Sequence, residues 1–234
     1  MTHSPHDSSR PDASALRCRR AWGRLLVVLV IGLTADLVTK WAAFRYIADA
    51  PVVIERAEVL RVTRLGHSLG VLIPPHEPVT VIPGVLDFTL VLNKGAVFGI
   101  GAGGPWVLLT LLGLGVGVWM FGVWTRAQDR AAHFAVGMLM AGGVGNLYDR
   151  VVYACVRDFI HPLPRVQLPF GWRMPLDGGR EIWPYVSNVA DLWLILGIVM
   201  FMWHLWRTGR DHSTGSKPAT GESEAAHGKS QTPG

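Results

Sequence analysis

Four long apolar stretches, separated by polar or irregular sequence, constrain this chain more than any other feature. A helix needs roughly 20 residues to cross the hydrocarbon core of a bilayer, which is about 30 Å thick. Half of the 234 residues are hydrophobic and only 17% are charged, whereas soluble domains carry about 25% charged residues. We therefore expect an α-helical membrane protein, a bundle of four transmembrane helices over residues 22–44, 105–124, 131–148 and 186–206.

Basic residues cluster at the ends of these stretches rather than on one soluble face, so the net charge of +5 does not indicate nucleic acid as a partner. Four arginines precede the first stretch, two lie in the turn after the second, and two follow the fourth. The positive-inside rule then places both termini in the cytoplasm. A cleaved signal peptide is the alternative interpretation of the first stretch, but apolar residues resume after Asp36.

The chain is expected to form one domain, residues 21–207, between disordered tails at 1–20 and 208–234 that are rich in small and polar residues. Its outer loops are residues 45–104 and 149–185. In the first loop, VTVIPGVLDFTLVLN predicts short strands of a small extracytoplasmic sheet. The second loop is dense in Pro and Gly, and its Trp172 and Trp183 suit the lipid headgroup layer.

Polar side chains gather at one level of the predicted bundle, near its outer surface. Charged residues within membrane spans are costly and usually functional. Each one alone has a structural explanation: Asp36 and Lys40 lie four residues apart and can neutralise each other, and Asn188 can cap the fourth helix. Their convergence favours a site instead. The converging residues are Asp36, Lys40, Asn93, Lys94, Asn146, Asp149, Arg150, Asp158, Asn188 and Asp191.

Two carboxyl groups from different segments, Asp158 and Asp191, suggest the chemistry. Carboxyls held close in a low-dielectric cleft share a proton, so that one is an acid and the other a base. A water between them can attack a carbonyl group, as in aspartic peptide hydrolysis without metal or cofactor. A metal pair with His161 is disfavoured because no further His or Cys clusters there. A small proton-coupled transporter or channel is the main alternative, although no internal repeat is visible, and a non-enzymatic scaffold is a third.

Four segments carry a more specific signal. They are DLVTKWAAF (36–44), VIPGVLDFTLVLNKGAVFGI (81–100), GGVGNLYDRVVYACVRDFI (142–160) and SNVADLWLILG (187–197). On these residues the chain resembles the lipoprotein signal peptidase (signal peptidase II) family, bacterial membrane aspartic endopeptidases that remove signal peptides from prolipoproteins. The similarity covers roughly residues 25–206. Compared with the family, residues 45–78 look like an insertion and 163–184 like an enlarged crossover.

The resemblance implies that Asp158 and Asp191 form the catalytic pair. It implies that other residues orient the pair, hydrogen-bond the substrate backbone and brace the first span, namely Asn146, Asp149, Arg150, Asn188, Asn93, Gly95, Asp36 and Lys40. The implied fold adds a β-cradle and a crossover segment on the outer face of the bacterial inner membrane. The implied partners are membrane lipids and a prolipoprotein, cut before its diacylglyceryl-modified cysteine. We expect a monomer with neither metal nor cofactor.

Overall fold

A computed structural model describes residues 14–95, 104–173 and 180–214 of the chain. Much of the two predicted tails, and residues 96–100 of the second motif, lie outside the described residues. The elements in chain order are η1 (Ala15–Arg17), α1 (Arg19–Tyr46), α2 (Arg56–Arg64), η2 (Leu69–Leu72), β1 (Val79–Ile82), β2 (Leu86–Asn93), α3 (Gly104–Val123), α4 (Arg130–Tyr153), β3 (Val156–Pro162), η3 (Pro169–Gly171) and α5 (Val189–Thr214).

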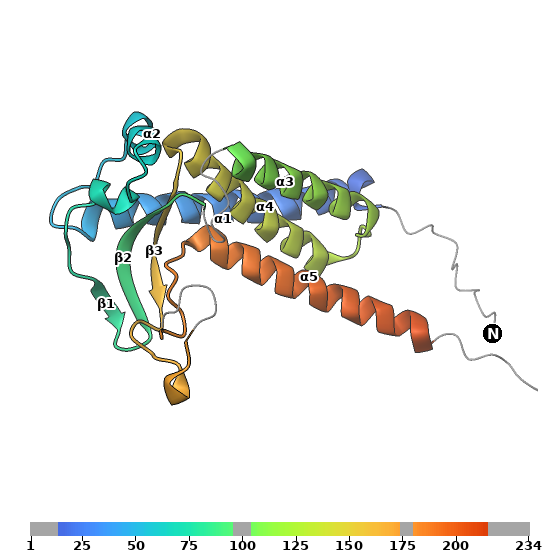
Figure 1. The fold of residues 1–234 in the computed structure, drawn as a ribbon. Helices are drawn as coiled ribbons and strands as arrows, with labels where there is room; N and C mark the ends of the chain where they lie inside the picture. Colours follow the sequence, from blue (N-terminus) through green and yellow to red (C-terminus); the bar gives the residue numbers. More distant parts are fainter. Residues whose placement is uncertain (1–13, 96–103, 174–179, 215–234) are drawn as a thin grey trace, which may run out of the picture.

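Helix α4 lies at the centre of a helical bundle and packs against α1, α3 and α5 (Figure 1). Its buried face consists largely of alanine and glycine, which let neighbouring backbones approach closely. The other three helices turn large apolar side chains outward, among them Val30 on α1, Leu108 on α3 and Val199 on α5. An exposed apolar belt of this kind is what a lipid environment requires.

Three helices in the described part of the chain are long and apolar enough to cross a membrane: Arg19–Tyr46, Trp106–Val123 and Val189–Thr208. They correspond to the first, second and fourth predicted spans. Helix α4 is not among them, because its glycines and polar side chains lower its mean hydropathy. The third span therefore stays a prediction, although its helix is present.

Several helix ends differ from the predicted bounds, and each has a local cause. The third span was expected to end at Tyr148, but α4 continues to Tyr153 and ends at Ala154, whose φ of 60° is left-handed. The fourth was expected from residue 186, but α5 begins at Val189, directly after Asn188. At the end of the bundle opposite the sheet, which we call the inner end, η1 contacts the end of α3 through a hydrogen bond from Ala15 N to Thr125 O of 3.1 Å.

The outer part of the molecule contains a three-stranded antiparallel sheet in the order β1-β2-β3. The short strands predicted in the first outer loop are confirmed as β1 and β2. The sequence did not indicate β3, which pairs with β2 so that Val91 lies opposite Asp158. The sheet and α2 share an apolar cluster with the outer end of α1 that includes Phe44, Val59 and Phe159.

Two apolar clusters, one at each end of the bundle, leave a polar layer between them. The inner cluster joins η1, α1, α3, α4 and α5, with Leu25, Phe121 and Phe201 among its members. The outer cluster begins at Ala43 on α1. The side chains of Asp36 and Lys40 lie between these clusters and are completely buried. The fold thus encloses charge at one level, as the sequence predicted.

Close packing of α4 against α5 gives a direct stability test. A Cβ added at Gly142 would lie 2.7 Å from Leu194 Cγ and would also overlap the carbonyl oxygen of Ala190. We expect Gly142→Ala to destabilise the fold by about 1–3 kcal/mol, the usual cost of overpacking, measured as a lower unfolding temperature in detergent. Gly115→Ala on α3 is the control, because nothing lies within 4 Å of its added Cβ. Equal unfolding temperatures for the two variants would contradict the packing described.

Candidate active site

The chain brings β3 and the start of α5 together through one backbone pairing. Ser187 N donates to Ile160 O over 2.8 Å, and Ile160 N donates to Ser187 O over the same distance. Ile160 follows Asp158 by two residues, and Ser187 precedes the first turn of α5. Segments that are separated by the whole crossover are therefore held side by side at this point.

Strand alternation decides which side chains of β3 face the site. Successive side chains of a strand point to opposite faces. Val156, Asp158 and Ile160 line a cavity of about 570 Å³ together with Asp191. Arg157, between them, points to the opposite side and binds Asp149 on α4.

Asn188 links the two carboxyl groups. Its Nδ2 donates to Asp158 Oδ1 over 2.6 Å, and its backbone N donates to Asp191 Oδ2 over 3.2 Å. Asp191 N donates back to Asn188 Oδ1 over 3.1 Å, so the two residues form a reciprocal cap on α5. The capping role considered for Asn188 is therefore present, and it coexists with the contact to Asp158. Asn146 Nδ2 donates to the second oxygen of Asp191 over 2.8 Å.

The environments of the two carboxyl groups differ. Asp158 in β3 is 1% exposed. Burial, followed by repulsion from Asp191, raises the pKa of Asp158 from its ordinary value of 3.8 to about 7. Hydrogen bonds from Asn188 and Asn93 oppose that rise in the pKa. Asp191 lies in the first turn of α5, where backbone N–H groups stabilise negative charge. The arrangement favours one proton held on Asp158.

Lys40 on α1 occupies the centre of the polar layer. Its Nζ lies 2.8 Å from Asp36 Oδ2, 3.3 Å from Asp149 Oδ2 and 3.3 Å from Asn146 Oδ1. Two of these contacts, to Asp36 and Asn146, are hydrogen bonds, and the third is an ion pair with Asp149. The predicted neutralisation of Asp36 by Lys40 is present, and the same cation also reaches α4.

Asp36 and Asp149, the two carboxylates that contact Lys40, also bind α5 and β3. Asp36 Oδ1 accepts a hydrogen bond from Ala190 N over 2.8 Å, which satisfies a free amide in the first turn of α5. Gly145 allows the approach, because a Cβ there would lie 2.5 Å from Asp36 Oδ2. Asp149 accepts from the backbone N of Arg157 over 3.0 Å and from its guanidinium over 2.8 Å.

The charges of this cluster balance only if one carboxyl group is protonated. Its four carboxyl groups are those of Asp36, Asp149, Asp158 and Asp191, and its three cations are those of Lys40, Arg150 and Arg157. A net charge enclosed in a low-dielectric region is strongly disfavoured. One proton shared by the Asp158 and Asp191 pair makes the cluster neutral, in agreement with the raised pKa of Asp158.

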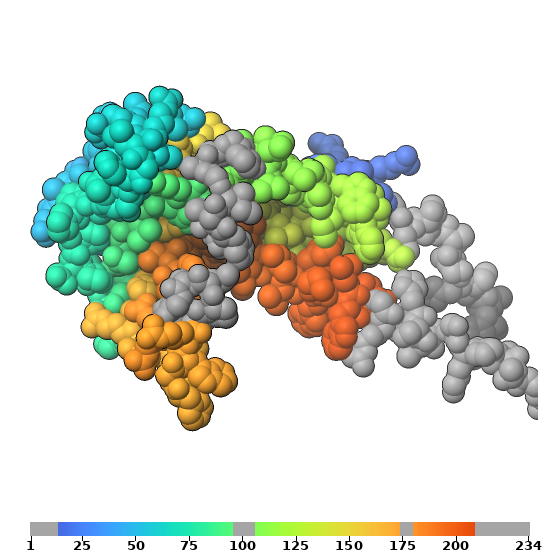
Figure 2. All heavy atoms as spheres, in the orientation of Figure 1, coloured from blue at the N-terminus to red at the C-terminus, as the bar shows by residue number. Residues whose placement is uncertain are grey.

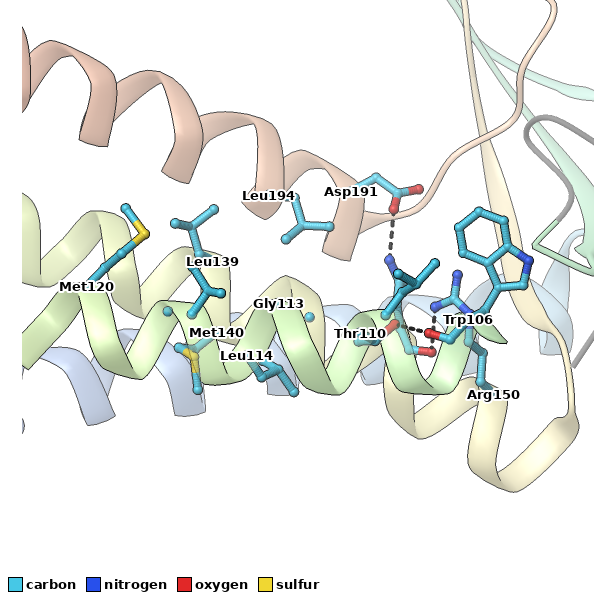
Figure 3. Close-up of a pocket in the computed structure, with 15 residues that line it drawn as sticks. Trp106, Thr110, Gly113, Leu114, Met120, Leu139, Met140, Arg150, Asp191 and Leu194 are labelled. Carbon is cyan, nitrogen blue, oxygen red and sulfur yellow. Dashed lines mark hydrogen bonds between the residues drawn. The ribbon is translucent and has the colours of Figure 1, made fainter. Parts of the chain in front are cut away.

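A second cavity, of about 490 Å³, runs from Asp191 along the bundle between α3, α4 and α5. Figure 3 shows Trp106, Arg150 and Asp191 at one end of this cavity, and apolar side chains such as Leu139 and Met120 farther along it. Asn146, Arg150, Asp191 and Trp106 line both cavities, so the two meet at Asp191. We call the cavity of about 570 Å³ that both carboxyl groups line the substrate chamber, and the cavity of about 490 Å³ along the bundle the apolar groove. The site is therefore a polar chamber that continues into an apolar groove.

All ten predicted site residues lie in or behind this chamber. Seven of them line it, namely Asn93, Gly95, Asn146, Arg150, Asp158, Asn188 and Asp191. The other three, Asp36, Lys40 and Asp149, are buried behind it. Lys94 was expected at the same level, but its Nζ binds His67 O in the outer loop.

The sequence did not indicate the aromatic wall of the chamber or the role of Arg157. Trp183 and Tyr185, from the crossover, line the chamber with their rings 6.4 Å apart. Trp106 lies 2.8 Å from where a Cβ of Gly95 would be, which explains the glycine. The alternation of β3 was the signal that could have assigned Arg157 to the face opposite Asp158.

Comparison with known proteins gives a consistent result. The family model described as signal peptidase (SPase) II matches residues 27–207. The lipoprotein signal peptidase of Methylobacterium radiotolerans is 32% identical over 58% of this chain and 72% of its own length. That of Mycobacterium tuberculosis strain H37Rv is 31% identical over 82% of this chain and 78% of its own length. A bacterial membrane enzyme solved by the in meso method has a similar fold, with a TM-score of 0.52 and 22% identity over 86% of this chain and 95% of its own.

Removing the central cation tests the polar layer. We expect Lys40→Met to destabilise the fold by about 3–5 kcal/mol, because it leaves two buried carboxylates without their shared partner. Lys94→Met is the matched control, since that ammonium group is in the outer loop and binds a carbonyl oxygen. The measurement is the unfolding temperature of each variant in detergent. A Lys40→Met protein as stable as the control would mean that the layer does not depend on this ion cluster.

Proposed function

The chain belongs to the signal peptidase II family of aspartic-type membrane peptidases, and from that premise we propose that it removes signal peptides from diacylglyceryl-modified prolipoproteins. The bond cut is the peptide bond before the lipid-modified cysteine. The observation that carries this proposal is the pairing of Asp158 with Asp191 in a buried chamber that continues into an apolar groove. A soluble peptide does not need such a groove, whereas a lipidated, membrane-embedded substrate does. Because the chain belongs to a peptidase family, we no longer favour the alternative hypothesis of a small transporter or channel.

The proposed mechanism uses the unequal protonation of the pair. Asp191, as carboxylate, takes a proton from a water molecule while the water oxygen attacks the carbonyl carbon. Asp158, which carries the shared proton, donates it to the carbonyl oxygen as negative charge develops there. Collapse of the tetrahedral intermediate breaks the C–N bond, and the proton held by Asp191 passes to the leaving amine. One hydroxyl proton of the intermediate returns to Asp158, which restores the starting protonation of the pair. Neither a covalent intermediate nor a metal is required.

Substrate positioning falls to groups around the pair. Arg150 lines both cavities, and its Nη1 donates to Asn146 O over 3.0 Å. Its Nε is buried and has no hydrogen-bond partner among the described residues. We assign this guanidinium to the substrate backbone near the scissile bond. Asn146 and Asn188 hold the carboxyl groups in place, and Trp183 and Tyr185 enclose the chamber.

The apolar groove is assigned to the membrane-embedded part of the substrate. It is bounded by α3 and α5, with α4 as its floor, and its lining includes Leu109, Leu139 and Leu194. Signal helices and acyl chains are both apolar, and burying apolar surface is worth about 25 cal/mol per Å². A substrate arriving from the bilayer would thus reach Asp191 without crossing water.

We propose four membrane spans, and the enclosure of α4 supports this number. Helix α4 packs against α1, α3 and α5, which supports its crossing the membrane with them even though its own composition is too polar for a lipid-facing span. The positive-inside rule places both termini in the cytoplasm. The sheet then forms the extracytoplasmic cradle, and the carboxyl pair lies near the outer surface of a bacterial membrane. We propose a monomer acting on a single substrate chain. Its domain extends beyond the predicted bounds 21–207, because η1 packs in the inner cluster and α5 continues to Thr214.

The assignment of the pair is tested by two isosteric substitutions. We expect Asp158→Asn and Asp191→Asn each to abolish cleavage of a lipidated precursor in vitro, because neither can exchange the proton that hydrolysis needs. Asp129→Asn is the matched control, a carboxyl group that begins α4 at the opposite end of the bundle, and it should cleave normally. Normal turnover by either variant of the pair would rule out the aspartic mechanism.

The pH dependence follows from the raised pKa of Asp158. Its proton is present below a pH of about 7 and is lost as the pH rises through that value. The acid that supports the carbonyl oxygen is then missing, so kcat/KM should decline on the alkaline side. A pH profile of the purified enzyme in lipid measures this. A rate that stays level up to pH 9 would contradict Asp158 as the acid.

A further inference from the structure

The crossover between β3 and α5 carries two exposed aromatic side chains at its tip. Phe170, in η3, is 91% exposed, the highest value for a large hydrophobic side chain in the described part of the chain, and Trp172 is 66% exposed. Their rings lie 6.3 Å apart. Phe170 has a φ of 59°, a left-handed conformation that is uncommon for an aromatic residue. Nothing in the apolar core requires these rings, so their exposure needs another cause.

The tip lies where the surface of a membrane would be. Figure 1 shows η3 to one side of the bundle, close to the level at which α5 begins, whereas the outer end of α1 reaches farther out. In Figure 2 the same segment, in orange, projects from the body of the molecule. Farther along, α5 exposes Ile198 and Val199, as a lipid-facing helix does. A tip at this depth and off to the side meets the headgroup layer.

The chemistry of the tip fits that layer. Tryptophan is enriched where membrane meets water, because its ring is apolar and its N–H remains able to hydrogen-bond. Phenylalanine supplies apolar area for the outer ends of the acyl chains. Arg165 and Arg173 flank the tip in sequence, and cations near a bilayer surface are attracted to anionic lipids.

The tip is coupled to the wall of the chamber by a short ladder of backbone hydrogen bonds. Leu168 N donates to Arg180 O over 2.7 Å, and Ile182 N donates to Val166 O over 2.8 Å. Trp183 and Tyr185 follow directly and line the chamber that holds the carboxyl pair. At its beginning the crossover is tied to the β1–β2 turn, where Leu163 N donates to Val85 O. A fixed tip therefore fixes the aromatic wall.

We propose that Phe170 and Trp172 insert into the outer leaflet beside α5 and so anchor the crossover over the substrate chamber. The occupant of this surface is the lipid bilayer in which the bundle sits, not a second protein. The inference rests on the membrane placement given under the proposed function. It goes beyond that function by assigning a lipid-binding role to the enlarged crossover.

Fluorescent labels at two positions test the insertion. In a Cys18→Ser background, Phe170→Cys and Val53→Cys are each labelled with an environment-sensitive dye. Val53 is the matched control, because it is 79% exposed and follows the outer end of α1. The proteins are placed in nanodiscs of phosphatidylethanolamine and phosphatidylglycerol that contain nitroxide-labelled lipids.

We expect nitroxide lipids to quench the label at 170 and aqueous iodide not to reach it. At 53 we expect iodide to quench the label and the nitroxide lipids to have little effect. A label at 170 that iodide reaches as easily as at 53 would overturn the inference. A label shielded from iodide but not quenched by lipid would also overturn it, since protein would then cover the tip.

A paired substitution supplies the functional readout. Phe170→Ser with Trp172→Ser should lower kcat/KM severalfold for a lipidated precursor in nanodiscs, without changing the unfolding temperature, because neither ring packs in the core. Unchanged kcat/KM would contradict the anchoring role. If the label at 170 behaves like the label at 53 while Asp191→Asn is inactive in the cleavage assay, only this inference is wrong and the proposed function stands. An active Asp191→Asn variant would instead sink the proposed function, whatever the labels report.

Discussion

The structure depends on one buried cation. Lys40 contributes the central ammonium group, which hydrogen-bonds to Asp36 on α1 and Asn146 on α4 and forms an ion pair with Asp149 on α4. Such a group is tolerated in a membrane interior only when its charge and donors are matched. Once Lys40 is matched, the positions of Asp36 and Asp149 are fixed. These two carboxylates in turn hold the first turn of α5 and the beginning of β3.

The carboxyl pair is therefore positioned by buried residues that do not line the substrate chamber. Asp36 holds the amide of Ala190, next to Asp191, and Asp149 holds Arg157, next to Asp158. Both contacts act on the neighbour in sequence of a proposed catalytic residue. Small rearrangements of the substrate chamber can then occur while the two carboxyl groups keep their relative placement.

Much of this site was readable from the sequence, and the limits have physical causes. Charges at membrane depth are rare, so Asp36, Lys40 and Asp149 stand out without any structure, and the spans fix their common level. Pairing across the crossover is not encoded locally, so β3 and its contact with Ser187 could not be predicted. Residues 131–148 were predicted as a span from their apolar character, but the glycines and polar side chains of α4 keep its mean hydropathy below that of the three candidate spans. The two cavities could not be predicted either, because each is formed where several elements far apart in the sequence fail to fill the space between them.

The central claim is that one proton is held on the carboxyl pair below a pH of about 7, and infrared spectroscopy measures it most directly. The account predicts a protonated-carboxyl C=O band in the enzyme in lipid that disappears as the pH rises through about 7 and is missing from the Asp158→Asn protein. The absence of a protonated-carboxyl band at pH 6, or a band with the same titration after that substitution, would contradict it.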